Sequence, residues 1–284
     1  MRDIATHSPE SLQEALGILS REGEGVKVIT GGTDLIVQIL EKKKAPRALL
    51  NLSRLAELRG IREEAGTIRI GALTTHREIE RSPILKAQAP LLCEGAFLVG
   101  SPQLRNLATI GGNVVNASPV ADTTTPLMAL DAVLTLQSRA AERKIPIRAF
   151  FLGPGRTVIR QDELLTEISF KGLGPGWVSF YERLGQRRLL SISKVGVAFT
   201  AANDGGTLRG VTVALGAVAA TVIMAPRTAA FLEGKRWSDH VALEASRVAE
   251  KESRAITDLR STDVYRNRMA GALLLRGLVR VMAR

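Results

Sequence analysis

The chain has 284 residues, of which 45% are apolar and 24% are charged, and its formal net charge is +11 at pH 7. This length and mixture favour a globular protein with two domains or one large domain, and they exclude a disordered chain, a collagen and a disulfide-stapled miniprotein. A single cysteine, Cys93, excludes an internal disulfide and a multi-cysteine metal or iron–sulfur site within this chain.

Two further classes of function find no support in the composition. The first residues lack the apolar segment of a secretory signal, and no run reaches the roughly 18 apolar residues of a membrane span. We therefore expect no membrane span and a location in the reducing cytoplasm. The basic residues are scattered, aromatic residues make up only 4% of the chain, and no nucleic-acid motif is present, so we expect no nucleic-acid partner.

The N-terminal part begins with alternating helix and strand patterns. Ser11 and Glu14 have the spacing of a capping box, which predicts a helix that ends at Gly23. The apolar run at 26–30 then predicts a buried strand, and a second helix is expected to close in the lysines at 42–44.

The same alternation continues beyond this second helix. Residues 67–72 predict another strand, and Thr75 with Glu78 has the spacing of a second capping box. Alternating elements of this kind favour an α+β or α/β first domain.

A different pattern begins near Lys171. The turn-rich segment GLGPGW at 172–177 predicts a domain boundary. Short strand patterns come first and helical patterns follow, which favours a smaller α+β second domain. The expected strands are 178–182, 195–201 and 208–217, with a hairpin tip at 203–206, and the expected helices are 227–232, 241–251 and 262–282.

Two glycine pairs are the strongest candidates for a ligand site. One is Gly31-Gly32, between an expected strand and an expected helix, and the other is Gly111-Gly112. Glycine lets the backbone approach a ligand closely, and successive N–H groups in such a bend bind phosphate oxygens. Neither pair fits a G-x-G-x-x-G or P-loop pattern. We therefore expect one diphosphate to lie between two loops that are distant in the sequence.

The residues around both pairs resemble a known family. TGGTDL at 30–35 and GSPQLRNLATIGGNVVNASPVAD at 100–122 are similar to the FAD-binding medium subunits of the molybdenum hydroxylases, the family of xanthine dehydrogenase and carbon monoxide dehydrogenase. Further similar segments follow in the family's order at 150–168, 179–188, 216–226 and 256–276. The resemblance implies an α+β fold, with a two-subdomain PCMH-type FAD-binding domain at 1–173 and a C-terminal domain at 177–284, which holds an antiparallel sheet with helices.

The resemblance also implies which residues bind FAD. The two loops would hold the diphosphate and the ribose, four residues would lie near the flavin ring, two would contact the nucleotide portion, and one arginine takes the place of the family's usual lysine near the ring. The residues of the two loops are Val28, Ile29, Thr30, Gly31, Gly32, Thr33, Asp34, Leu35, Ala108, Thr109, Ile110, Gly111, Gly112 and Asn113. The residues near the flavin ring are Leu35, Val99, Gly100 and Leu165, and those that contact the nucleotide portion are Ser118 and Asp122. The arginine in the place of the lysine is Arg183.

Structural roles are open for several of these residues. Leu165 has the character of a core residue, Asp122 could cap a helix over 123–130, and Arg183 could be a solvated surface charge. The stripe Arg276, Arg280 and Arg284 on the last expected helix is open in the same way, as a solvated face or as a contact with an acidic partner.

His7, His76 and His240 lack metal-ligand spacing and none abuts a glycine loop, so we expect no metal ligand and no covalent link to a flavin. The resemblance further implies non-covalent FAD in this chain and no catalytic side chain. A large subunit with the molybdenum cofactor and a small subunit with two [2Fe–2S] clusters would be the partners, in a dimer of heterotrimers. FAD would then pass electrons from the clusters to an external acceptor. A stand-alone FAD-dependent oxidoreductase is the alternative. The substrate and the acceptor are not encoded here, and Ser191 stands where relatives commonly carry aspartate.

Overall fold

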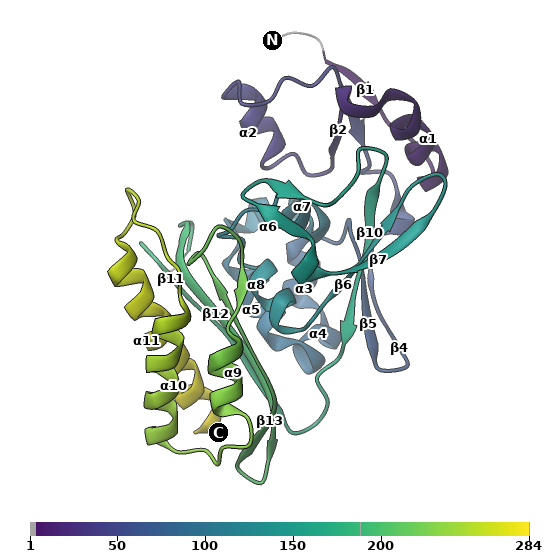
Figure 1. The fold of residues 1–284 in the computed structure, drawn as a ribbon. Coiled ribbons are helices and arrows are strands. Elements are labelled where there is room, and N and C mark those ends of the chain that lie inside the picture. Colours follow the sequence, from purple (N-terminus) through teal and green to yellow (C-terminus); the bar gives the residue numbers. More distant parts are fainter. Residues whose placement is uncertain (1–3, 188, 284) are drawn as a thin grey trace.

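The first layer of the fold is a small parallel sheet at the N-terminus. A computed structural model describes residues 4–187 and 189–283. The sheet has the order β1-β3-β2, and α1 and α2 accompany it (Figure 1). The elements are β1 (Ala5–His7), α1 (Leu12–Glu22), β2 (Val26–Ile29), α2 (Leu35–Leu40) and β3 (Ala48–Asn51).

The second layer is a five-stranded antiparallel sheet in the order β4-β5-β10-β6-β7. Its apolar face, which includes Ile68, Leu134 and Ile168, packs in one core with residues of the helices that follow β5. The elements are β4 (Ile61–Glu64), β5 (Thr67–Gly71), α3 (His76–Arg81), α4 (Pro83–Gln88), α5 (Pro90–Leu98), α6 (Pro102–Leu107), α7 (Ile110–Val115), α8 (Thr124–Ala129), β6 (Val133–Gln137), β7 (Glu142–Pro146), β8 (Phe151–Gly153), β9 (Arg156–Thr157) and β10 (Leu164–Lys171).

The third layer is a four-stranded antiparallel sheet in the order β11-β12-β13-β14. Helices α9, α10 and α11 cover one side of it, and it also contacts α5 and α8 of the second layer (Figure 1). The predicted α+β fold with an antiparallel sheet and helices at the C-terminus is confirmed. The elements are β11 (Trp177–Gly185), β12 (Ser193–Asp204), β13 (Thr207–Gly216), β14 (Ile223–Met224), α9 (Pro226–Leu232), α10 (Asp239–Glu252) and α11 (Asp263–Met282).

The local signals gave most of these elements correctly. Thr75 and Glu78 form the complete capping box of α3. The expected hairpin tip forms at Gly205 and Gly206, whose φ angles of 55° and 90° match the positive values that a tight two-residue turn requires. Among the described residues no helix combines the length and the apolar character that crossing a bilayer would require.

Three local predictions were wrong. Strand β2 is not buried, because it lies at the edge of its sheet and only Val26 is fully covered. Helix α2 ends before the lysines, because Lys42 adopts a φ of 58°, which an α-helix cannot contain. Only half of the first capping box forms: Ser11 accepts the N–H of Glu14, but the Glu14 carboxylate accepts the N–H of Glu10.

Candidate functional site

The two glycine loops meet in space. Residues 28–35 lead from β2 into α2, and residues 108–113 form the start of α7. The side-chain oxygens of Thr30 and Thr109 are 3.1 Å apart. A Cβ on Gly31 would overlap the carbonyl oxygen of Leu107, so the backbones approach as closely as glycine allows. The prediction that the two bends close together is confirmed.

The first loop offers unused backbone donors. Gly32 has a φ of 68°, which turns the chain sharply after β2. Within residues 4–187 and 189–283, the N–H groups of Gly31, Gly32 and Thr33 have no acceptor. Successive free N–H groups in a bend form a concave anion site, because their dipoles point to a common centre. This loop therefore fits a phosphate group.

The second loop differs, because its backbone donors are already used. The N–H groups of Ile110 and Gly111 bind the carbonyl oxygens of Thr74 and Ala72 at 3.0 and 2.9 Å, and that of Gly112 binds the Thr109 hydroxyl at 3.2 Å. What remains for a ligand is side-chain chemistry, from the Thr109 hydroxyl and the Asn113 amide. The first loop therefore supplies the backbone donors, and the second loop supplies the opposite wall.

Small residues also fix the second loop to the sheet beneath it. A Cβ on Gly111 would lie 2.7 Å from both the Cβ and the carbonyl oxygen of Ala72, directly after β5. The N–H of His76 donates to the carbonyl oxygen of Ala108 at 3.0 Å. The loop is thus held from behind by the segment between β5 and α3.

His76 is an unusual buried group behind this loop. Its side chain is fully buried, and neither ring nitrogen has a hydrogen-bond partner among the described residues. Burial, with a smaller contribution from Arg105, lowers the pKa of His76 to about 4. The ring is therefore neutral in the folded chain at neutral pH.

We expect the loop region to lose stability in acid through His76. The unfolded chain binds a proton at this histidine below its ordinary pKa of 6.5, whereas the folded chain does so only near 4. Stability should therefore fall as the pH drops from 6.5, by about 2 kcal/mol at about pH 5. Urea unfolding at pH 6.5 and at about pH 5 measures this loss of stability. The variant His76→Leu should not show the loss that protonation of His76 causes. An unchanged dependence in the variant would contradict the assignment.

Asp122 and Arg183 form a buried ion pair between the second and third layers. Arg183 Nη1 lies 3.0 Å from Asp122 Oδ2, and their side chains are 2% and 10% exposed. The hydroxyls of Tyr181 and Ser193 donate to Asp122 Oδ1 at 2.8 and 2.6 Å. Arg183 therefore is not a solvated surface charge. Asp122 does not cap α8. The N-cap residue of this helix is Thr123, and its side chain makes no capping hydrogen bond.

Burial dominates the electrostatics of this cluster. It raises the pKa of Asp122, an effect that Arg183 and the two hydroxyls partly oppose. Burial and the neighbouring Asp122 carboxylate also raise the pKa of Tyr181 well above its ordinary value. Sequence reasoning missed Tyr181 and Ser193 as partners of Asp122, although Tyr181 lies within the resembling segment 179–188 and Ser193 lies shortly after it.

The cluster connects to the flavin-ring residues and to the second loop. Arg183 Nη1 also donates to the carbonyl oxygens of Leu98, at 3.4 Å, and Ser191, at 3.0 Å. Leu98 directly precedes the predicted ring residues Val99 and Gly100. The Thr123 hydroxyl, next to Asp122, donates to Asn113 Oδ1 at 2.7 Å.

The other predicted residues have different surroundings. Leu165 is 6% exposed and belongs to the core beneath the five-stranded sheet. Gly100 has a φ of 47° and packs against the Leu104 side chain. Ser118 accepts the N–H of Ala121 through its carbonyl oxygen. Burial raises the pKa of Asp34, and the nearby charge of Lys44 partly opposes this shift. Their contacts with FAD remain predictions.

Ser191 takes part in a loop contact that an aspartate would change. Its hydroxyl donates to the carbonyl oxygen of Arg187 at 2.8 Å, and a Cβ on Gly185 would overlap that hydroxyl. The position is therefore closely packed against the end of β11. The Ser191 hydroxyl does not bind the Asp122 carboxylate, which accepts hydrogen bonds from the hydroxyls of Tyr181 and Ser193.

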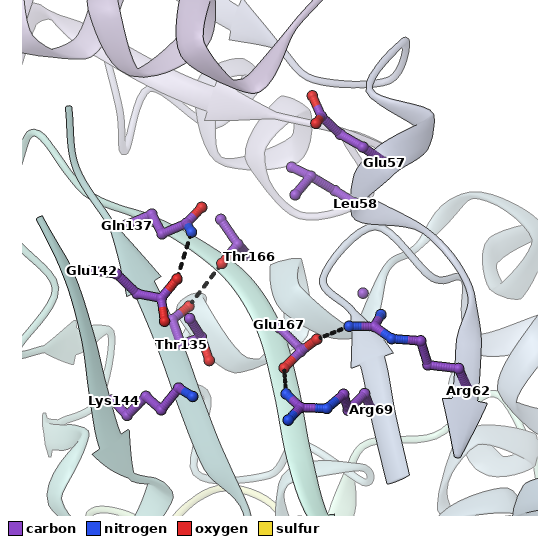
Figure 2. A pocket seen from close by; sticks show the side chains of 11 residues that line it. Glu57, Leu58, Arg62, Arg69, Thr135, Gln137, Glu142, Lys144, Thr166 and Glu167 are labelled. Atoms are coloured by element: carbon purple, nitrogen blue, oxygen red, sulfur yellow. Dashed lines mark hydrogen bonds and ion pairs between the residues drawn. The ribbon is translucent and has the colours of Figure 1, made fainter. Parts of the chain in front are cut away.

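A separate cavity lies between residues 57–58 and the polar face of the five-stranded sheet. It has a volume of about 270 Å³ (Figure 2). Glu167 binds both Arg62 and Arg69 at 2.6 Å, and Gln137 donates to Glu142 at 2.7 Å. No predicted site residue lines it, and its volume is below the roughly 300–1,000 Å³ typical of pockets for drug-sized ligands. The glycine loops stay the predicted FAD site.

Comparisons with known proteins agree with this geometry. Residues 2–170 match the family model of the FAD-binding domain in molybdopterin dehydrogenase, and residues 180–281 match that of the carbon monoxide dehydrogenase flavoprotein C-terminal domain. The chain belongs to the FAD-binding medium subunits of the molybdenum hydroxylases. It is accordingly an oxidoreductase subunit.

Individual relatives cover between about three quarters and nearly all of the chain. The carbon monoxide dehydrogenase medium chain of Hydrogenophaga pseudoflava is 33% identical over 98% of this chain and 96% of its own length. The putative xanthine dehydrogenase FAD-binding subunit of Escherichia coli is 34% identical over 78% of this chain and 77% of its own. A structure of reconstituted carbon monoxide dehydrogenase from Oligotropha carboxidovorans matches with a TM-score of 0.95 at 30% identity, over 99% of this chain and 98% of that one.

Within the described residues, no group of three or more His, Cys, Asp or Glu side chains could hold a metal ion. The joined glycine loops and the adjacent Asp122–Arg183 cluster are the candidate ligand region. The sequence left two roles open for Arg276 and Arg280, a solvated stripe or a contact with a partner. In the structure Arg276 forms an ion pair with Glu182, and Arg280 forms ion pairs with Glu94 and Glu182 of the same chain. Arg284 lies outside the described residues.

Proposed function

We propose that this medium subunit holds the FAD of a molybdenum hydroxylase complex and so connects the [2Fe–2S] clusters of a small subunit with an external electron acceptor. The partners would be that small subunit and a large subunit with the molybdenum cofactor, in a dimer of heterotrimers. The domain limits at 1–173 and 177–284 and the cytoplasmic location belong to the same proposal. The observation that carries it is the contact between the two glycine loops, with three free backbone donors on one of them.

The chain's own residues would bind and orient the cofactor. The N–H groups of Gly31, Gly32 and Thr33 would neutralise diphosphate oxygens, and the Thr109 hydroxyl and the Asn113 amide would donate from the facing loop. When bound, the flavin supplies the electron-transfer chemistry, so no side chain of this subunit needs to act as acid or base.

The Asp122–Arg183 cluster would fix the segment that follows α5. Arg183 holds the Leu98 carbonyl oxygen from the third layer, and Val99 and Gly100 come next. A buried, fully hydrogen-bonded network keeps such a segment in one position, because each alternative position leaves charged groups unpaired. We propose that this network sets the position of the residues nearest the flavin ring.

The experiment is a comparison of the intact complex with its FAD-depleted form. Purified complex should show visible flavin absorption and one FAD per medium subunit. After reduction by limiting dithionite, the intact complex should be reoxidised much faster than the depleted form, with NAD⁺, oxygen and a soluble quinone tested in turn. A complex that contains no FAD and takes none up would overturn the proposal, as would a lone medium subunit that oxidises substrate by itself.

A further inference from the structure

The residues that lead from α5 into α6 do not belong to any strand. Helix α5 ends at Leu98, and Ser101 caps α6 by accepting the N–H of Leu104. Between them Gly100 adopts a φ of 47°, which turns the chain. Among the described residues the N–H groups of Gly100 and Ser101 have no acceptor. We call residues 98–101 the ring segment, and its position depends on the groups that hold its carbonyl oxygens.

Two buried arginines donate to these carbonyl oxygens from different elements. Arg183 of β11 donates to the Leu98 carbonyl oxygen at 3.4 Å. Arg105 of α6 donates through Nη1 to the Val99 carbonyl oxygen at 3.2 Å, and its side chain is only 3% exposed. A guanidinium carries several N–H donors in one rigid plane, so a single arginine can hold two acceptors at a set spacing. Arg105 can therefore fix Val99 relative to a second group.

The second acceptor of Arg105 is a carboxylate in α3. Arg105 Nε donates to Glu80 Oε2 at 2.9 Å, and the Glu80 side chain is largely buried. The guanidinium carbon also lies 5.3 Å from the centre of the Phe97 ring, near the end of α5. A buried and paired guanidinium has few alternative positions, because each of them would leave charged groups unpaired. Arg105 thus connects the ring segment to α3 through fixed contacts.

Helix α3 also holds the second glycine loop. His76 is the first residue of α3, and its N–H donates to the carbonyl oxygen of Ala108 at 3.0 Å. Glu80 follows His76 by four residues, so the two residues lie on one face of the helix. This face contacts α6 through Arg105 and the residue after α6 through Ala108. One short helix therefore carries contacts to the ring segment and to the loop at 108–113.

We propose that Arg105 is a positioning residue that sets the spacing between the ring segment and the second glycine loop, so that both ends of one FAD molecule fit at the same time. This inference rests on the proposed function, in which the ring segment faces the flavin and the glycine loops hold the diphosphate. A ligand with two linked ends gains affinity only where both of its subsites are spaced to suit it. Arg105 should therefore matter for whole FAD and not for its ADP half.

The first test compares FAD with ADP as ligands of the FAD-free chain. In Arg105→Lys the ammonium can pair with Glu80, but a point charge cannot also hold the Val99 carbonyl oxygen as the guanidinium plane does. The Kd for FAD should rise about tenfold, as for the loss of a hydrogen bond to a charged group, while the Kd for ADP should stay within about twofold. Titration calorimetry measures both values. Unchanged FAD affinity, or an equal loss for FAD and ADP, would overturn the proposal.

Two variants in the same ion-pair group separate positioning from stability. Arg77 binds Glu80 Oε1 at 2.9 Å and has no hydrogen bond to the ring segment in the part of the chain that the structure describes, so Arg77→Gln should leave both Kd values unchanged. Glu80→Gln keeps an amide oxygen for Arg105 Nε but removes the paired charge, so the free energy of unfolding should fall while the ratio of the two Kd values stays that of the wild type. A ratio that changes in either variant as much as in Arg105→Lys would overturn the proposal, because the ratio would then follow stability.

The third measurement reports on the flavin ring itself. In the whole complex at saturating FAD, the visible circular dichroism of the bound flavin should differ between wild type and Arg105→Lys and should be unchanged in Arg77→Gln. Identical spectra in all three proteins would overturn the proposal. Wild-type protein that binds neither FAD nor ADP would instead refute the proposed function, whereas wild-type binding with an unchanged ratio in Arg105→Lys would refute the role of Arg105 alone.

Discussion

Replacing Gly31 with alanine is expected to weaken FAD binding by about ten- to a hundredfold. The new Cβ would overlap the Leu107 carbonyl oxygen, which belongs to backbone and cannot rotate away. The loops would have to separate, and overpacking of this kind costs about 1–3 kcal/mol. Titration of the FAD-free chain with FAD, followed by flavin fluorescence, measures the affinity.

Two further variants separate ligand binding from folding. Gly174→Ala is the matched control, because its Cβ would meet only Trp177 at 4.0 Å. In Gly112→Ala the new Cβ would lie 3.0 Å from Thr109 Oγ1 and 3.8 Å from Thr30 Oγ1, between the two loops. That variant should keep the wild-type circular dichroism while its FAD affinity falls. Full FAD occupancy in both Gly31→Ala and Gly112→Ala would show that the cofactor binds elsewhere.

Replacing Arg183 with methionine is expected to lower the free energy of unfolding by about 3–5 kcal/mol at neutral pH. The change leaves the Asp122 carboxylate buried without its cation, which is the costly half of breaking a buried ion pair. Denaturant unfolding of the FAD-free chain measures the loss. Removing both charges in Asp122→Leu with Arg183→Met should cost less than Arg183→Met alone, because no uncompensated charge remains.

The stability of the single variant Arg183→Met should show a characteristic pH dependence. Burial already raises the pKa of Asp122 above its ordinary value of 3.8, and loss of Arg183 raises it further. In the window above 3.8 the folded chain then binds a proton that the unfolded chain has released, so stability falls as the pH rises through that window. The difference between wild type and Arg183→Met should therefore be smallest in acid and grow toward neutral pH. A difference independent of pH would show that Asp122 is not the group left unpaired.

Local signals in the sequence determined the elements that depend on nearby residues. The Thr75–Glu78 spacing fixed the start of α3, and the two glycines at 205–206 fixed the hairpin between β12 and β13. Signals of this kind succeed because the interacting groups are only a few residues apart. They failed at α2, where Lys42 leaves the helix, and at β2, where only the order of strands in the sheet decides which strand lies at the edge.

The sequence by itself determined the family, the order of the elements and the two glycine loops, because these are carried by contiguous residues such as 30–35 and 100–122. Only the tertiary structure decided that Gly31 touches Leu107 and that Asp122 contacts Arg183, Tyr181 and Ser193. It also decided that the backbone N–H groups of the first loop are free, whereas those of the second loop are already hydrogen-bonded. The reason is physical: these contacts join residues about 60 to 80 positions apart, and their burial arises only when the layers pack together.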